Sequence, residues 1–159
     1  MKKILLIFGL LILINIAFRM PITEHEVGWD TYFIDSLAQS IQKESYIKWN
    51  LNPLSLVGFY DFSYSSGLPL ILAMIGKIIL LDIEKIIFII SILNSFLAFL
   101  GMWMFSGYFT KKSLNRILSA FFYSIAPGFI YFTSWMGSPR GIFAAIIPFF
   151  VFFLFKLNE

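Results

Sequence analysis

Hydrophobic residues in this chain are gathered into long stretches separated by polar segments. The first stretch covers residues 4–20. An insert rich in polar residues begins at residue 19, where that stretch ends, and runs to residue 85. Three more apolar stretches follow, at 86–105, 117–135 and 141–157. An α-helix rises 1.5 Å per residue and the hydrocarbon core of a bilayer is about 30 Å thick, so roughly 17–25 residues cross it. The pattern therefore predicts an all-α, polytopic membrane protein with about four transmembrane helices.

The first apolar stretch begins with Lys2 and Lys3, as a signal peptide does. A signal peptide ends in small residues at its cleavage site. Here Arg19, Met20 and Pro21 come instead. We interpret residues 1–20 as a first transmembrane helix that is not removed.

Two helices are predicted inside the polar segment 21–85. Residues 30–43 place five apolar side chains on one helical face: Phe33, Ile34, Leu37, Ala38 and Ile41. Asp30 stands where the N-cap of this helix would stand. Residues 68–81 are apolar except for Lys77. Because 14 residues reach only about 21 Å, we expect this second helix to lie along the outer leaflet with Lys77 toward water.

The distribution of charge predicts the orientation. If residues 68–81 do not cross the membrane, six basic residues fall on one side with both termini, and eight of the nine acidic residues fall on the other. Basic residues near the ends of spans mark the cytoplasmic side. The sequence thus predicts a multi-pass protein of the cell membrane, with a cytoplasmic N-terminus and segment 21–85 as an extracytoplasmic loop. The six basic residues are Lys2, Lys3, Lys111, Lys112, Arg116 and Lys156.

Composition supports the membrane prediction and excludes several functions. Hydrophobic residues make up 59% of the chain and charged residues 13%, so many of the 20 Phe must face lipid. The chain has no cysteine, which excludes disulfides, thiolate catalysis and cysteine-bound metals. No basic run suggests nucleic acid. Transporters place charged residues at mid-membrane, and the last three predicted spans have none there.

Three places carry candidate chemistry. Asp30 lies just outside the first span, where a carboxylate can accept a proton from a substrate or bind a divalent cation; the alternative is that it only caps its helix. Arg140 is the only charge between the last two spans, and its planar guanidinium suits a phosphate; the alternative is an anchor to lipid headgroups. Glu24, His25 and Glu26 are consecutive, so in an extended segment they point to opposite sides. We interpret them as a solvated loop.

The order of these features resembles a known family. An acid motif, Gly28-Trp29-Asp30-Thr31-Tyr32-Phe33, follows the first span, and Tyr64-Ser65-Ser66-Gly67-Leu68-Pro69-Leu70 opens the short apolar helix. The next span ends in Gly107-Tyr108-Phe109-Thr110-Lys111-Lys112, and the one after contains Ser124-Ile125-Ala126-Pro127-Gly128-Phe129-Ile130-Tyr131. This order resembles the N-terminal part of the GT-C superfamily of membrane glycosyltransferases, which includes oligosaccharyltransferase catalytic subunits and protein O-mannosyltransferases.

The resemblance implies transfer of a sugar from a polyprenyl-phosphate carrier on the extracytoplasmic face. An acid of the first outer loop lies at the active site of such enzymes, and Asp30 occupies the matching position. Oligosaccharyltransferase-like members carry a second acidic motif after the third span, whereas this chain has Ser138-Pro139-Arg140. The difference leaves a divalent-cation cofactor open, with Asp30 as its candidate ligand. It also favours the mannosyltransferase-like side, where an arginine occurs in this region, and makes Arg140 the candidate for the donor phosphate.

GT-C enzymes have many more spans than four. The resemblance therefore implies the front part of a larger enzyme whose further spans come from additional sequence or another chain. The expected partners are membrane lipid and the polyprenyl-phosphate-linked sugar. One alternative stays open: a small non-enzymatic membrane subunit whose acidic outer loop docks a partner.

Overall fold

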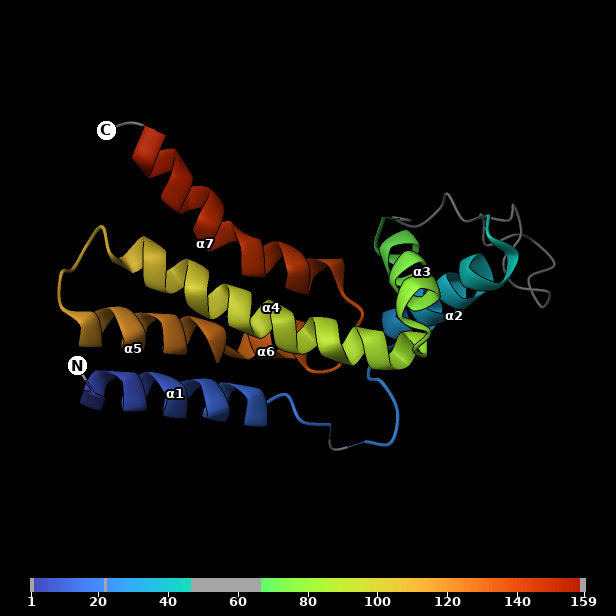
Figure 1. The fold of residues 1–159 in the computed structure, drawn as a ribbon, viewed down its shortest axis with the longest axis horizontal. Coiled ribbons are helices and arrows are strands. Elements are labelled where there is room, and N and C mark those ends of the chain that lie inside the picture. Colours follow the sequence, from blue (N-terminus) through green and yellow to red (C-terminus); the bar gives the residue numbers. More distant parts are fainter. Residues whose placement is uncertain (1, 22, 47–66, 158–159) are drawn as a thin grey trace.

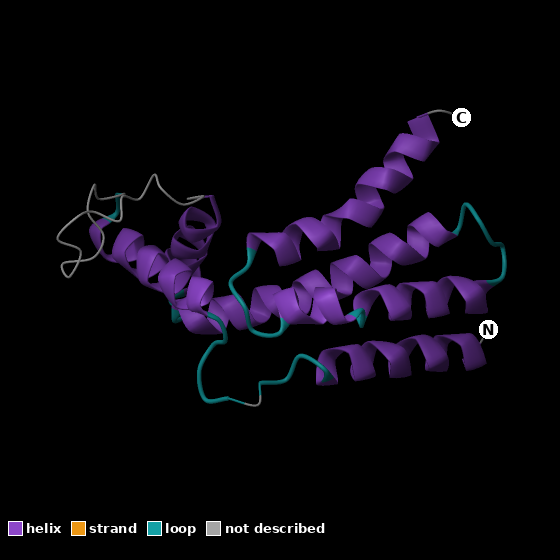
Figure 2. Ribbon diagram, turned by 180° about the vertical axis from the view of Figure 1, so that it is seen from behind, coloured by secondary structure: helices purple, strands orange, loops and turns teal. Residues whose placement is uncertain are grey.

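The structure is a computed structural model, and it describes residues 2–21, 23–46 and 67–157. Within these ranges the chain forms seven helices and no strand (Figures 1 and 2). The helices are α1 (Lys2–Ala17), α2 (Trp29–Glu44), α3 (Gly67–Ile79), α4 (Ile83–Ser106), α5 (Ser113–Ser124), α6 (Pro127–Thr133) and α7 (Pro139–Leu157). The all-α prediction is confirmed for this part of the chain. Residues 64–66 of the second quoted motif lie outside the described ranges.

Four rows of helix lie side by side, with α4 in the middle. Helix α4 packs against α5 and α7, and α1 packs against α5 and α4 (Figure 1). Helices α2 and α3 pack against each other beyond the N-terminal end of α4. Both ends of the chain lie at the opposite end of the bundle, as Figure 2 also shows from behind. The molecule thus has a helical bundle and, at one end, a cap formed by α2 and α3.

Two helices are long enough and apolar enough to cross a membrane. Helix α4 has 24 residues and a mean hydropathy of 2.2, and α7 has 19 residues and a mean hydropathy of 2.0. Their lengths are about 36 and 28 Å. Both agree with an integral membrane protein, and they contain the predicted spans 86–105 and 141–157. The four-span arrangement and its orientation stay predictions.

The predicted span 117–135 is two helices instead of one. Helix α5 ends at Ser124, and α6 begins at Pro127, which occupies its first turn. Proline has no backbone N–H and clashes with the carbonyl group four residues earlier, so it begins a helix more easily than it continues one. Pro127 therefore makes a complete break in the predicted span.

The side chain of Arg19, just after the end of α1, makes hydrogen bonds on both sides of this break. Its side chain is only 1% exposed. The guanidinium donates hydrogen bonds to the backbone oxygen of Ser124 at 2.7 Å, to Thr133 Oγ1 at 3.1 Å and to the backbone oxygen of Asn15 at 2.9 Å. It also bonds Asn15 Oδ1 and lies over the Phe129 ring. The Ser124 carbonyl lost its helical partner at the break, and Arg19 replaces that partner.

The apolar face predicted for residues 30–43 is confirmed as the face that α2 packs against α3 and α4. Ile34, Leu37, Ala38 and Ile41 are buried there, against side chains that include Leu72 of α3. Asp35 of α2 is partly buried, and its Oδ1 atom is shielded from solvent. Lys77 is exposed and donates a hydrogen bond to Ser45 Oγ just after α2.

Large apolar side chains cover much of the outer surface of the bundle. Leu6 and Leu13 on α1 are 72% and 65% exposed, and Phe143 and Phe150 on α7 are 68% and 62% exposed. Contiguous apolar surface of this kind is typical of faces that contact lipid or another protein. It agrees with the prediction that many Phe residues face lipid.

Candidate functional site at the start of α2

Helix α2 begins at a glycine, and not at the predicted cap. Gly28 is the N-cap residue, with φ 98° and ψ 140°, and no side chain caps the helix. Side chains rarely tolerate this backbone conformation. A Cβ at Gly28 would also lie 2.9 Å from the Met136 methyl group. The prediction that Asp30 caps the helix is therefore wrong, because the chain turns two residues earlier, where only glycine fits.

Thr31 joins the start of α2 to the turn between α6 and α7. Its hydroxyl group donates to the backbone oxygen of Val27 at 2.7 Å and accepts from the backbone N–H of Gly137 at 3.1 Å. The backbone N–H of Val27 in turn donates to the backbone oxygen of Trp135 at 3.1 Å. Thr31 is fully buried. These bonds hold the first turn of α2 against residues 135–137.

Trp135 extends this junction to the start of α4. Its indole N–H donates to the backbone oxygen of Glu84 at 3.1 Å, and its ring meets Phe88 at 5.8 Å between centroids. Trp135 itself has φ 52°, a conformation uncommon for non-glycine residues. The α6–α7 turn is thus fixed to both α2 and α4.

The two predicted site residues lie on either side of this junction. Asp30 is exposed in the first turn of α2, next to Thr31. The positive end of the helix dipole favours a carboxylate there. Arg140 is exposed in the first turn of α7, three residues after Gly137, and its guanidinium lies over the Phe132 ring at 5.6 Å. The structure therefore brings their elements together, and a shared pocket for the two side chains stays a prediction.

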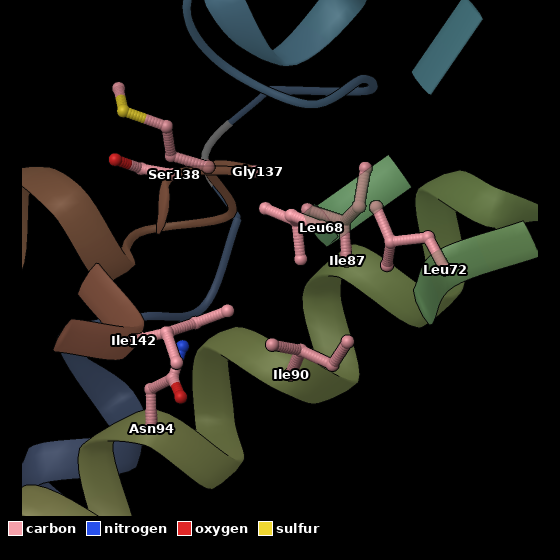
Figure 3. Close-up of a pocket in the computed structure, with 9 residues that line it drawn as sticks. Leu68, Leu72, Ile87, Ile90, Asn94, Gly137, Ser138 and Ile142 are labelled. Atoms are coloured by element: carbon pink, nitrogen blue, oxygen red, sulfur yellow. The ribbon is translucent and has the colours of Figure 1, made fainter. Parts of the chain in front are cut away.

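A small hollow lies beneath the junction (Figure 3). Figure 3 shows Leu68 and Ile87 near Gly137 and Ser138, and Asn94 at the far end beside Ile142. The space that can hold the centre of a water molecule is about 10 Å³, enough for one water. Asp30 and Arg140 do not line it. The full lining is Leu68, Leu72, Ile87, Ile90, Asn94, Met136, Gly137, Ser138 and Ile142.

A larger, open hollow lies beside the break between α5 and α6. It has a volume of about 510 Å³ and a mainly apolar lining. Val27 and Met136 connect it to the junction, and Asp30 and Arg140 are again absent from its lining. Its size is that of a small-molecule site. The lining is Val27, Ile125, Pro127, Ile130, Tyr131, Ser134 and Met136.

Glu26 lies under the same junction and contradicts the predicted solvated loop. Glu24 and His25 are exposed as expected, whereas Glu26 is only 3% exposed. Burial, together with the nearby charges of Asp35 and Glu84, raises the pKa of Glu26 from 4.5 to about 8. Only one of the two acids is therefore shielded from water, and the consecutive spacing alone does not reveal which.

A divalent cation does not fit the residues described. Within the described ranges, no group of three or more histidine or acidic side chains is arranged to hold a metal ion. Asp30 offers one exposed carboxylate, whereas calcium and magnesium take several oxygen ligands. The chemistry of this site is therefore derived from Asp30 and Arg140 alone.

No family model, curated protein or solved structure matches this chain. Its own residues and geometry are therefore the basis for assigning a function. The likeness to GT-C glycosyltransferases stays a prediction, and it bears on function through Asp30 and Arg140.

Sequence patterns missed three residues that hold the site together. The sequence pattern indicates that Thr31 is an ordinary residue at the start of a helix and that Glu26 is a loop residue. Arg19 reads as the end of a span. Their partners are distant in sequence: Thr31 contacts Gly137, 106 residues away, and Arg19 contacts Thr133, 114 residues away. The one local signal was Gly28, which marks a turn just before the helix.

Proposed function

We propose that this chain is the membrane-embedded N-terminal part of a glycosyltransferase. It acts with further spans and transfers a sugar from a polyprenyl-phosphate carrier on the side of the membrane where α2 and α3 lie. The observation that carries the proposal is the hydrogen bond between Thr31 Oγ1 and the backbone N–H of Gly137. This bond fixes the helix start that bears Asp30 against the turn that leads to Arg140.

In the proposed reaction, Asp30 acts as a general base. The acceptor hydroxyl loses its proton to the Asp30 carboxylate while its oxygen bonds the anomeric carbon of the sugar. The bond between that carbon and the phosphate oxygen breaks, and its electron pair leaves on the carrier phosphate. Arg140 stabilises the negative charge that develops there, because its guanidinium can bind two phosphate oxygens at once. Both side chains are exposed, so both are open to a substrate.

The open hollow beside the α5–α6 break supports a lipid-linked donor. Its lining is mainly apolar, and Val27 at its rim lies three residues before Asp30. A hydrocarbon chain in this hollow would bury apolar surface on both partners. Its phosphate would then lie toward the water-facing end of the bundle, where Arg140 is exposed.

A second candidate is the non-enzymatic subunit that docks a partner through its outer loop. One observation favours it: Asp30 is exposed in the first turn of α2, where a partner protein can reach it. On this alternative, neutralising Asp30 weakens association with a partner protein and leaves any transfer activity unchanged.

The test is transfer from a lipid-linked sugar by the chain in its native membranes, which supply the remaining spans. Asp30→Asn keeps the shape of the side chain and removes its charge. Because Asp30 makes no capping bond, folding should be nearly unaffected, with a loss of at most about 1 kcal/mol from the helix dipole. Loss of a general base lowers the rate by about 10²–10⁴-fold, and we expect a loss of that size.

Glu24→Gln is the matched control, since Glu24 is an exposed acid in the same loop. It should retain wild-type transfer. Wild-type transfer activity in Asp30→Asn would refute the catalytic role of Asp30. If this variant kept its activity but lost association with a partner protein, the docking subunit would be favoured.

A further inference from the structure

Two carboxylates at the junction have buried oxygen atoms with no hydrogen-bond partner. Glu26 comes just before the turn into α2, and Asp35 lies on α2 itself. Glu26 Oε2 and Asp35 Oδ1 are both buried and unbonded. The other oxygen of Asp35, Oδ2, accepts a hydrogen bond from Gln39 at 2.7 Å. Glu26, at 3% exposure, is thus a nearly water-free carboxyl group with an unpartnered oxygen.

The groups around Glu26 are acidic on both neighbouring helices. Asp35 on α2 and Glu84 on α4 are near enough for their charges to act on the Glu26 carboxyl group. The backbone N–H of Glu26 donates to Glu84 Oε1 at 3.1 Å, which holds the Glu84 carboxylate against the Glu26 backbone. His25 Nδ1 lies 3.3 Å from the same Glu84 oxygen, but its side chain is 71% exposed. Lys85, also exposed, pairs with Asp82 at 2.6 Å.

Burying an ionised carboxylate without a hydrogen-bond donor or a cation is very unfavourable, and a group in this position takes up a proton instead. Two acids beside it make ionisation harder still. We propose that Glu26 is a proton-operated latch: its neutral carboxyl group lets segment 23–28 pack onto α2 and α4, and its ionisation releases that segment. The latch is independent of the proposed transfer reaction.

Release of the segment would loosen the start of α2. The backbone bond from Val27 to Trp135 lies directly after Glu26, and Gly28 follows as the N-cap of α2. Ionised Glu26 would repel both Asp35 and Glu84 in a site with low dielectric. The chain can relieve this repulsion by moving residues 23–28 into water, which breaks the bonds at Glu26 and Val27 first.

The sign of the pH dependence follows from proton linkage. In the packed form, burial and the neighbouring acids hold the pKa of Glu26 at about 8, against 4.5 for the exposed group. Opening therefore releases a proton between these two pH values, so packing is strongest in acid and weakens as the pH rises. The opening equilibrium should increase about tenfold per pH unit over this range and level off above about pH 8.

Amide hydrogen exchange of the full chain in detergent micelles measures this opening. The amides of Glu26 and Val27 report it, after correction for the intrinsic pH dependence of exchange. In the wild type we expect their corrected exchange to rise between pH 5 and pH 8. Glu26→Gln copies the neutral acid and should abolish the rise. Glu24→Gln, the exposed control, should keep the wild-type profile.

A second variant distinguishes the latch from a merely structural effect. Asp35→Asn removes one neighbouring charge, so the pKa of Glu26 falls and the level region should begin at a lower pH. The proposal would be overturned if the wild-type profile were flat. It would also be overturned if exchange levelled off at the same pH in Asp35→Asn and in the wild type. It would also be overturned if millimolar Ca²⁺ or Mg²⁺ restored packing at pH 8 in the wild type but not in Glu26→Gln, because the acids would then hold a cation.

Discussion

At the scale of single residues, Gly28 determines where Asp30 lies. Its φ of 98° turns the chain into α2, and a methyl group in its place would contact Met136 at 2.9 Å. The backbone conformation is the main constraint, because the Met136 methyl group is the flexible end of a side chain and can shift. Because the helix starts at this glycine, Asp30 falls in the exposed first turn and keeps both carboxylate oxygens free of capping.

Gly28→Ala should therefore destabilise the protein by about 1–3 kcal/mol, the range for a side chain forced into this backbone region. Gly9→Ala is the matched control: Gly9 lies inside α1 with nothing within 4 Å of the added Cβ. That change should stabilise helix α1 by up to about 1 kcal/mol. Denaturant unfolding in mixed micelles, followed by circular dichroism, measures both. Equal stability of Gly28→Ala and wild type would contradict the assigned backbone conformation.

At the scale of helices, the sequence was most informative where apolar residues recur on one helical face. The apolar face of α2 was predicted correctly, and residues 30–43 agree with Trp29–Glu44 to within one residue at each end. The pattern predicted one span at 117–135, whereas the structure divides it into α5 and α6 at Pro127. A proline shows where a helix is interrupted, but the completeness of the break depends on a partner for the free Ser124 carbonyl. That partner, Arg19, is 105 residues away.

Arg19→Lys tests this compensation. Lysine keeps the buried charge, but its single ammonium group cannot reach the Ser124 carbonyl, Thr133 and Asn15 together. A buried acceptor left without a donor costs about 1–3 kcal/mol, so the free energy of unfolding should fall by at least that amount. Arg140→Lys, at an exposed arginine, should change it by no more than about 0.5 kcal/mol. Similar effects of the two variants in the same unfolding assay would argue against a structural role for Arg19.

At the scale of the whole molecule, the structure shows two helices that can cross a membrane, and the four-span arrangement stays a prediction. The bundle has both ends of the chain at one end and the α2–α3 cap at the other. Helices α4 and α7 are long enough to cross a membrane, whereas α1 has 16 residues and the third row is divided between α5 and α6. Composition and hydropathy predicted the all-α class, whereas the sidedness inferred from the charges stays a prediction. They did not predict the junction of α2 with the α6–α7 turn, because the bonds that connect the turn to α2 and α4 join residues far apart in sequence.

Labelling of single cysteines tests the account most directly, because the chain has no cysteine of its own. Ser45 follows α2 in the cap and Ser113 begins α5 at the other end of the bundle, and both are exposed. Four crossings with a cytoplasmic N-terminus predict that a membrane-impermeant thiol reagent labels Ser45→Cys only from outside the cell and Ser113→Cys only from the cytoplasmic side. Labelling of both positions from the same side would contradict the four-span topology and the placement of Asp30 and Arg140 on the outer face.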